Sequence, residues 1–532
     1  MVRQACCFLL LPAALVLISS SAPSGAQTAS TSNAIEPAKM PLLGSVDARF
    51  QSYNIEMVEV TGGRFWAPYK QQTTGPTAVA DTKVATPGGI DPSLFRMRSP
   101  IDLDNPRLRK LAAALGPAYV RVSGTWANTT YFHDSDAAAP ATPPSGFNGV
   151  LTRKEWKGVI DFSKAVNARI VTSFAVSAGV RDPGGVWSPV EAEKVLAFTR
   201  KAGGSIAAAE LFNEPNFAAA GGTSKDYDAA AYGRDFNAFK AFVAKAAPEM
   251  KILGPGSVGE GGSMAVIPGM RFMRSEDMLA ASGEGLDAFS YHFYGGVSQR
   301  CKAMGAVNQA TPEGALKADW LLRTNRDETF YAALRDRFAP GKPLWLTETG
   351  ETACGGNPWA STFLDSFRYL NQLGTLAKKG VQVVMHNTLA ASDYALIDEV
   401  TLAPRPNYWS AFLWRKLMGT KVLDAGTPGS PDLYLYAHCL RDHPGGVALL
   451  AINADRGEAS VLALPIGSSR YALTSAELTS GEIELNGAAL RLDADGDLPV
   501  IAGVATAAGK VSLAPTSITF FALPKANNPS CR

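Results

Sequence analysis

The fold is inferred first from one segment, Ile206-Ala207-Ala208-Ala209-Glu210-Leu211-Phe212-Asn213-Glu214-Pro215-Asn216. It begins with a short apolar run, which is typical of a β-strand that is buried on both faces. An amphipathic helical pattern follows at Tyr227–Ala246. A buried strand followed by a helix is the repeating unit of parallel α/β folds, so we assign the chain to the α/β class.

The same alternation extends over residues 53–419. The predicted strands are Tyr53–Val60, Ala118–Ser123, Ala168–Val176, Ile206–Leu211, Lys251–Leu253, Ala288–Tyr294, Pro343–Thr347 and Val381–Asn387. Helical patterns lie between them at Asn105–Leu115, Leu151–Val166, Pro189–Ala202, Tyr227–Ala246, Ser361–Lys379 and Tyr408–Met418. Eight strands that alternate with helices favour a closed (β/α)8 TIM barrel over an open sheet.

The helical period disappears after residue 419. Short strand patterns separated by turn residues follow at Leu433–Leu440, Gly446–Asn453, Ala459–Leu464, Tyr471–Leu478, Glu482–Leu485, Ala489–Leu492 and Lys510–Leu523. They predict an appended β-sandwich domain formed by residues 420–532, to which residues 46–52 add an N-terminal strand. Residues 27–45 are rich in Ser, Thr, Ala and Pro, and we expect a flexible lead there.

The N-terminus has the pattern of a signal peptide. Arg3 supplies a positive charge, Cys6–Ile18 is an apolar run, and Ser24-Gly25-Ala26 offers small residues for cleavage. We therefore assign residues 1–26 to a signal peptide and expect a secreted or periplasmic protein. The alternative is a membrane anchor, but the apolar run is short for a span.

Composition excludes several classes of function. The 532 residues are 46% hydrophobic, and the formal net charge is +2. This balance gives no global attraction to nucleic acid or to a membrane surface, and we expect a monomer without such partners. The five histidines show no ligand spacing supported by nearby carboxylates, and no Gly-rich phosphate loop is present, so we expect neither a metal nor a cofactor.

Four cysteines lie beyond the predicted signal peptide, namely Cys301, Cys354, Cys439 and Cys531. Export from the cytoplasm permits disulfides, and these cysteines allow three pairings. We favour Cys301–Cys354 and Cys439–Cys531, because each pair would then lie within one domain. The alternative is free, buried thiols.

Two glutamates stand at the ends of predicted strands. Glu214 follows the fourth strand, and Glu348 ends the seventh in Trp345-Leu346-Thr347-Glu348-Thr349. Active sites of TIM barrels lie at these strand ends. Two facing carboxyl groups about 5–5.5 Å apart suit retaining glycoside hydrolysis, with Glu214 as general acid/base and Glu348 as nucleophile, and we expect ionised Glu348 to raise the pKa of Glu214. The alternative is that both glutamates only cap helices.

Further motifs resemble a known family. The segment 212–216 resembles the acid/base motif of clan A barrel glycosidases, and 345–349 resembles their nucleophile strand. The closer match is to glycoside hydrolase family 79, the heparanases and β-glucuronidases, over roughly residues 50 to 525. Its most specific segments are Val120–Thr125, Tyr291–Tyr294, Cys354–Gly356, Val383–Met385, Asp393–Tyr394, Leu396–Glu399 and Asn407–Trp409. The resemblance implies a retaining barrel enzyme with an appended β-sandwich.

The resemblance also implies roles around the sugar ring. Asn213 would hydrogen-bond the 2-hydroxyl, and Glu56 would bind the glycone. His292 and Tyr294 would line the site, one of them bonding the nucleophile. The alternative for His292 is a structural histidine.

A uronic acid carboxylate would be bound, by the same resemblance, by the backbone N–H groups of Gly355 and Gly356 and by Tyr394. Glycine lets a backbone approach an anion closely without adding bulk. The alternative is an ordinary Gly-Gly turn. Two features depart from the heparanase pattern: the loop from Glu348 to Gly355 is one residue longer and carries a cysteine in place of an aromatic, and Trp126 stands where a lysine is expected.

Six basic residues fall in predicted βα loops: Arg181, Lys225, Arg271, Arg274, Arg300 and Lys302. Cations beside a cleft suit sulfates on an extended chain. They favour endo-acting cleavage of β-glucuronide linkages in a polysaccharide such as heparan sulfate over exo-β-glucuronidase activity. The alternatives are ordinary solvated charges, a clan A glycosidase for a neutral sugar, and a carbohydrate-binding or adhesion protein on an inactive barrel.

Overall fold

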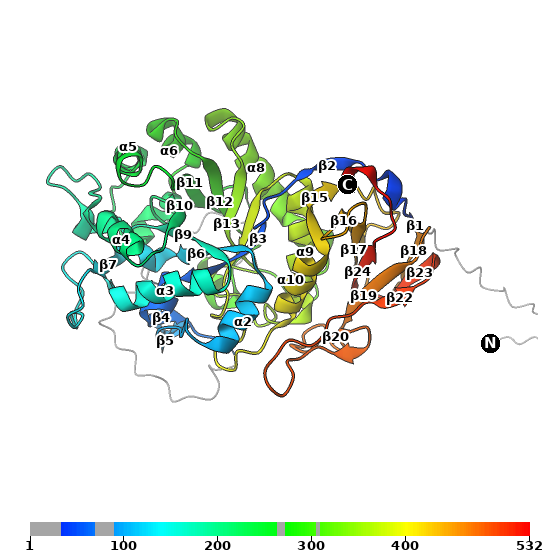
Figure 1. Cartoon of the computed structure of the whole chain (residues 1–532). Helices are drawn as coiled ribbons and strands as arrows, with labels where there is room; N and C mark the ends of the chain where they lie inside the picture. Colours follow the sequence, from blue (N-terminus) through cyan, green and yellow to red (C-terminus); the bar gives the residue numbers. More distant parts are fainter. Residues whose placement is uncertain (1–32, 70–89, 263–271, 305–308) are drawn as a thin grey trace, which may run out of the picture. The chain divides into compact units, whose positions relative to one another are not determined.

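The computed structural model describes residues 33–69, 90–262, 272–304 and 309–532 (Figure 1). The predicted signal peptide, residues 1–26, and the loop residue Arg271 lie outside the described residues. Within the described ranges, no helix combines the length and the apolar character needed to cross a bilayer.

A closed barrel of eight parallel strands forms the larger part of the chain. Its strands are β3 (Gln51–Glu56), β6 (Ala118–Ser123), β9 (Ala168–Ser173), β10 (Ile206–Glu210), β11 (Lys251–Val258), β12 (Ala288–Tyr294), β13 (Leu344–Gly350) and β14 (Val383–His386). Each strand pairs with the next in sequence, and β14 closes on β3 with Val384 opposite Gln51. The predicted TIM barrel is therefore confirmed.

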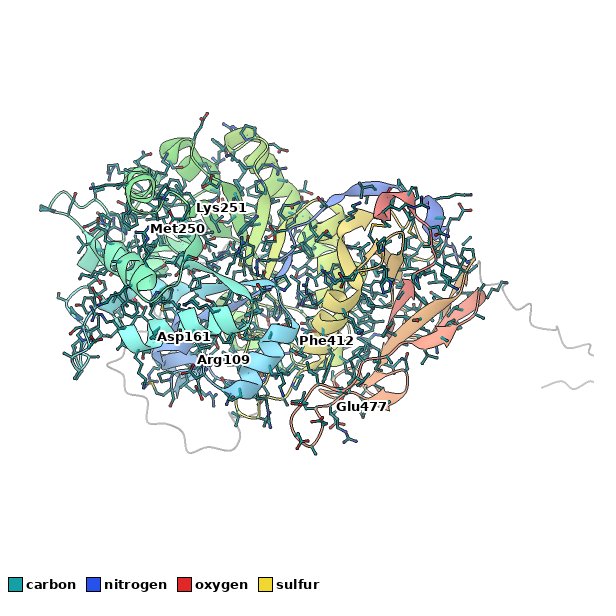
Figure 2. The ribbon with its side chains drawn as sticks, in the orientation of Figure 1. Arg109, Asp161, Met250, Lys251, Phe412 and Glu477 are labelled. Carbon is teal, nitrogen blue, oxygen red and sulfur yellow. A yellow bond between two sulfur atoms is a disulfide. The ribbon has the colours of Figure 1, made fainter. Side chains whose placement is uncertain are left out.

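Helices cover the outside of the barrel (Figure 1). They include α2 (Pro106–Ala114), α3 (Arg153–Ala165), α4 (Val190–Lys201), α5 (Ala229–Ala246), α6 (Ser275–Ser282), α8 (Arg323–Phe338), α9 (Phe363–Lys378) and α10 (Pro406–Leu417). Their amphipathic character explains their place: α2 and α3 bury Leu108, Trp156 and Ile160, while Arg109 and Asp161 stand on their outer faces (Figure 2).

The C-terminal part of the chain is a β-sandwich, as predicted. A nine-stranded sheet follows the order β2-β15-β16-β17-β24-β19-β20-β21, with β22 paired to β19, and a three-stranded sheet follows the order β1-β18-β23. The strands are β1 (Asn33–Ala34), β2 (Leu42–Ser45), β15 (Met418–Leu423), β16 (Leu433–Leu440), β17 (Val447–Asn453), β18 (Ser460–Leu464), β19 (Ser468–Thr474), β20 (Glu484–Leu485), β21 (Ala488–Ala489), β22 (Val504–Thr506), β23 (Gly509–Leu513) and β24 (Ser517–Leu523). Apolar side chains from both sheets, such as Leu449, Phe521 and Leu462, share one core.

The N-terminal contribution to the sandwich differs from the prediction. The strands are Asn33–Ala34 and Leu42–Ser45, which belong to the expected flexible lead, and not residues 46–52. Ile35 and Met40 are buried in the sandwich core, which gives this polar-looking segment its order.

Several predicted strands have other bounds in the structure, and two of them change the elements. The first barrel strand ends at Glu56, and α1 (Met57–Thr61) follows where the strand was expected to continue. The predicted strand Lys510–Leu523 is two strands, β23 and β24, joined by a turn at Thr516, whose φ of 48° is left-handed. Both predicted disulfides, Cys301–Cys354 and Cys439–Cys531, are confirmed.

Candidate active site

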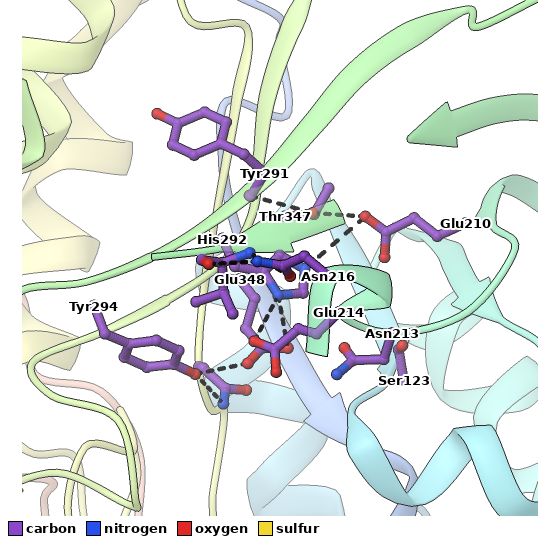
Figure 3. Close-up of polar contacts among 12 residues, drawn as sticks. Ser123, Glu210, Asn213, Glu214, Asn216, Tyr291, His292, Tyr294, Thr347 and Glu348 are labelled. Carbon is purple, nitrogen blue, oxygen red and sulfur yellow. Dashed lines mark hydrogen bonds and ion pairs between the residues drawn. The ribbon is translucent and has the colours of Figure 1, made fainter. Parts of the chain in front are cut away.

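The two predicted catalytic glutamates converge at one mouth of the barrel (Figure 3). Glu214 follows β10, and Glu348 lies near the end of β13. A carboxylate oxygen from each glutamate and a ring nitrogen of His292 all lie within 4.8 Å of one another. Both carboxylates line a cavity of about 130 Å³, so a sugar placed in it would meet both groups.

Glu214 is held in an unusual backbone conformation. Its φ of 49° and ψ of 61° are left-handed, which is a strained state for a residue with a side chain and often marks a functional position. Burial raises the pKa of Glu214 to about 7, with Arg121 lowering it and Glu210 raising it further. The expectation that Glu348 raises this pKa was wrong: burial is the main cause.

Glu348 accepts a hydrogen bond on each oxygen. The hydroxyl of Tyr294 donates to Oε1 at 2.7 Å, and Nη1 of Arg121 donates to Oε2 at 2.8 Å. Burial raises the pKa of Tyr294 well above its usual range, so its phenol stays protonated and donates. These contacts fix the orientation of the carboxylate, and of the two residues expected near the nucleophile, Tyr294 is the one that bonds it.

Arg121 is the main residue that the sequence prediction missed. It is 1% exposed and lies between Glu348 and Glu210, donating through Nε and Nη2 to Glu210 at 3.1 and 2.8 Å. Burial alone would lower its pKa, but the charges of Glu210 and Glu348 raise it overall. A signal was available, because an arginine between two valines in a buried strand requires buried carboxylates.

His292 is a neutral hydrogen-bond donor to Glu214. Burial lowers the pKa of His292 to about 4. Its Nε2 lies 3.3 Å from Nη2 of Arg121, which can only donate, so Nε2 must accept and the ring proton resides on Nδ1. Nδ1 lies 3.1 Å from Oε1 of Glu214, and His292 therefore orients that carboxyl group.

Of the predicted glycone residues, Glu56, Tyr294 and Tyr394 line the same cavity, whereas Asn213 and His292 are not among its lining residues. Asn387, also missed, donates through Nδ2 to Glu56, Tyr294 and Tyr394 at 3.1, 3.0 and 3.2 Å. Burial, followed by the charge of Glu348, raises the pKa of Glu56 well above its usual range. Gly124 leaves room for this carboxyl group, since a Cβ there would lie 1.5 Å from its Oε2.

Two hydrogen bonds hold Asn213 in place and leave its side-chain NH2 group without a partner among the described residues. Its Oδ1 accepts from Arg121 at 2.8 Å, and its backbone N–H donates to Oδ1 of Asn128 at 2.8 Å. No described residue pairs with its Nδ2, which leaves an amide donor beside Glu214 for a sugar hydroxyl.

The Gly355–Gly356 segment is a strongly curved, buried loop that directly follows Cys354, which lines the cavity, whereas neither glycine is among the lining residues. Cys354, Gly355 and Gly356 have φ angles of 65°, 81° and 83°. Only glycine fits at the centre, because a Cβ on Gly355 would lie 2.5 Å from Oγ of Ser392 and 2.6 Å from Cβ of Trp66. Among the described residues, nothing accepts the backbone N–H of either glycine, so both remain available for an anion.

Most of the described basic residues that were predicted to flank the site are paired with carboxylates. Arg181 pairs with Asp235, Arg274 with Glu276, and Arg300 with Asp393. The paired Arg300 side chain is 2% exposed, which makes it part of the protein interior. Lys225 and Lys302 are exposed, but neither lines the cavity, and Arg271 lies outside the described residues.

The carboxylate pair and His292 form the single group of potential metal ligands found among the described residues. The guanidinium of Arg121 contacts Glu348 in that group, and its positive charge opposes a divalent cation there. The arrangement suits proton transfer and nucleophilic attack by carboxylates.

Removing the Arg121 guanidinium should destabilise the protein strongly. Arg121→Ala leaves Glu210 and Glu348 buried without their counter-charge, and we expect a loss of about 3–5 kcal/mol in unfolding free energy. Urea denaturation would measure it. Arg153→Ala, which breaks partly exposed pairs with Asp134 and Asp136, is the control and should cost far less. Equal losses in the two variants would contradict the central role of Arg121.

Comparisons with known proteins place the chain in a family. The model of "Glycosyl hydrolase family 79, N-terminal domain" matches residues 97–374. The chain is 27% identical to heparanase of Mus musculus over 499 residues, covering 81% of this chain and 88% of that protein. It is 37% identical to baicalin-beta-D-glucuronidase of Scutellaria baicalensis over 190 residues, covering 34% of this chain and 36% of that protein.

Solved structures agree on the architecture. A 4-O-alpha-L-rhamnosyl-beta-D-glucuronidase from Fusarium oxysporum superimposes with a TM-score of 0.62 over 92% of this chain and 100% of that one, at 14% identity, which shows the fold alone. The family match, on this barrel, makes the chain a protein of the glycoside hydrolase class. Since the family match covers more than half of its length, the chain belongs to glycosyl hydrolase family 79.

Proposed function

We propose that this protein hydrolyses β-glucuronide linkages with retention of configuration. The observation that carries the proposal is the convergence of Glu214 and Glu348, with oxygens within 4.8 Å, on a cavity at the C-terminal mouth of the barrel. This spacing suits direct attack by a carboxylate and leaves no room for the water that an inverting enzyme holds between its carboxyl groups.

The first chemical step joins the sugar to the protein. Oε of Glu348 attacks the anomeric carbon while protonated Glu214 gives its proton to the glycosidic oxygen, so the bond to the leaving group breaks as the glycosyl ester forms. Neutral His292 donates to Glu214 and holds the acid in place without competing for its proton.

The second step hydrolyses the glycosyl ester and regenerates the free enzyme. Departure of the leaving group admits water beside Glu214, and hydration of the carboxyl group lowers the pKa that burial had raised. Glu214 then takes a proton from water, the resulting hydroxide attacks the anomeric carbon, and Glu348 is released.

Selection of a glucuronide is assigned to the Gly355–Gly356 loop and Tyr394. The two free N–H groups would bind the sugar carboxylate, as oriented backbone donors do. The hydroxyl of Tyr394 accepts from Asn387, which leaves its own proton for the carboxylate. The names of the family relatives, heparanase and baicalin-beta-D-glucuronidase, support the same class of sugar.

The glycone assignment predicts a large preference between two chromogenic substrates. We expect nitrophenyl β-glucuronide to be cleaved at least about 100-fold faster than the β-glucoside, because buried donors left unpaired by the glucoside cost binding energy. Tyr394→Phe should lower kcat/KM for the glucuronide about tenfold and leave the glucoside rate within twofold. Tyr434→Phe, at a buried tyrosine of the sandwich, is the control. Faster cleavage of the glucoside by the wild-type protein would refute the carboxylate site.

Endo-acting cleavage of heparan sulfate-type chains is a more specific prediction than hydrolysis of β-glucuronides. Its electrostatic basis is reduced, since Arg181, Arg274 and Arg300 are neutralised by carboxylates. Product analysis on heparan sulfate tests it: internal oligosaccharides would establish endo cleavage, and released monosaccharide alone would establish exo cleavage. Action outside the cytoplasm, as a monomer, is likewise proposed, and the two disulfides support export.

A further inference from the structure

A pair of stacked aromatic rings stands directly beside the proposed acid/base. The 3-10 helix η7 (Pro215–Ala220) starts immediately after Glu214 and carries Phe217. The ring of Phe217 stacks on that of Phe272, with centroids 5.1 Å apart and an interplanar angle of 27°. Both rings are half-buried and line the cavity, so each keeps an accessible surface toward a ligand.

The backbone holds this pair next to Glu214. The N–H of Met273 donates to the carbonyl of Asn216 at 2.9 Å, which ties the segment that carries Phe272 to the one that carries Phe217. Asn216 is in turn anchored to β11 through two hydrogen bonds with the backbone of Val258. The aromatic pair is therefore attached to the barrel at the same point as the acid/base.

The chemistry of the site assigns a side of the cavity to this pair. A general acid must lie within hydrogen-bond reach of the glycosidic oxygen, so the group beyond that oxygen lies over the residues that flank Glu214. The glycone instead lies toward Glu56, Asn387 and Tyr394, which are linked to one another by hydrogen bonds. Phe217 and Phe272 thus border the leaving group.

The lining of the cavity is largely apolar and aromatic on the side of this pair. The carboxylic side chains that line it are Glu56, Glu214 and Glu348, and no lysine or arginine of the described ranges is among its lining residues. Trp126, which stands where the heparanase pattern has a lysine, contributes an indole to the same lining. A planar apolar group placed here would gain contact with the rings.

We propose that Phe217 and Phe272 form a binding site for an aromatic leaving group, and that the substrates of this protein are β-glucuronides of aryl alcohols. The inference rests on the proposed glucuronidase function and specifies the substrate class of that site. An aryl group offers a flat face for stacking on the two phenyl rings.

The test compares an aryl with an alkyl substrate in the whole protein. Values of kcat/KM are measured for naphthyl β-glucuronide and methyl β-glucuronide with the wild-type protein, Phe217→Ala and Phe217→Trp. Because the two leaving groups differ in intrinsic reactivity, the quantity compared is the change that each substitution causes. We expect Phe217→Ala to lower the naphthyl value about tenfold and the methyl value less than twofold, and Phe217→Trp to retain the naphthyl value.

Phe272→Ala serves as the second variant and should repeat the selective loss. Phe338→Ala on α8, away from the cavity, is the matched control and should change neither value. Equal losses on both substrates, or no loss on either, would overturn the inference. Faster cleavage of a heparan sulfate oligosaccharide than of the naphthyl glucuronide by the wild-type protein would overturn it too. Failure of the wild-type protein to cleave any of the three glucuronides would instead refute the proposed function.

Discussion

Glu348→Gln is expected to reduce glucuronide hydrolysis by about 10⁴-fold or more in kcat/KM. An amide cannot form the glycosyl ester, although it can still accept from Tyr294 and therefore fits the same space. Arg121 keeps its hydrogen bonds to Glu210 in this variant, so the protein should still fold, and loss of activity in a folded protein would identify a chemical role. Hydrolysis of nitrophenyl β-glucuronide measures it.

A matched substitution separates chemistry from burial. Glu260 is also a largely buried glutamate, bonded to Ser275 and not among the residues that line the cavity, and Glu260→Gln should keep activity within about threefold. Retention itself is checked by proton NMR of the first product formed, which should be the β-anomer. Initial release of the α-anomer, or full activity in Glu348→Gln, would rule out Glu348 as the nucleophile.

Glu214→Gln should produce a loss that depends on the leaving group. We expect kcat/KM to fall about 10³-fold for methyl β-glucuronide, whose alkoxide needs a proton, and much less for dinitrophenyl β-glucuronide, whose leaving group departs unaided. Equal losses on both substrates would show that Glu214 does not act as the acid.

The same residue sets the expected pH dependence. Burial raises the pKa of Glu214 to about 7, and the acid must be protonated in the free enzyme, so kcat/KM should fall about tenfold per pH unit above pH 7. In Glu214→Gln this decline should disappear. A decline that persists unchanged in the variant would assign it to another group.

The barrel could be predicted because its strands are short apolar segments with clear ends. Ala118–Ser123 and Ala288–Tyr294 have the predicted bounds. β11 was predicted to stop at Leu253 because Gly254-Pro255-Gly256 has turn composition, yet the strand continues to Val258 through a register shift between Pro255 and Ser257. Proline and glycine are tolerated in a strand at such a bulge, and local composition cannot reveal it.

Helix α8 shows another limit of prediction from the sequence. Its polar sequence gives little amphipathic signal, and it buries Asp327 and Glu328 together with Tyr331 against the barrel. Ordinary hydrophobic periodicity does not detect a helix of this kind. The segment 33–45 was misjudged for a related reason, because only a few scattered side chains, Ile35, Pro37 and Met40, provide its burial.

The candidate site was predicted where one residue type at one position defines the chemistry. Glutamates at strand ends met that condition. Asn387 and Arg121 did not, since their roles depend on contacts with residues 331 and 227 positions away in the chain. The prediction of sulfate-binding cations failed for the same reason: Arg300 is basic in the sequence, but Asp393, its neutralising partner, is 93 positions distant.

The pairing of the first and last parts of the sandwich has a consequence for biogenesis. Residues 33–45 leave the ribosome before the barrel, but their partners are Lys421–Leu423 and Leu462–Ala463, and Asn528 donates to the carbonyls of Pro37 and Met40. Nascent β1 and β2 must therefore wait, unpaired, while some four hundred residues are synthesised, and the barrel can assemble first. Premature termination before Asn528 would leave that early segment without its final anchor and expose it to quality-control proteases.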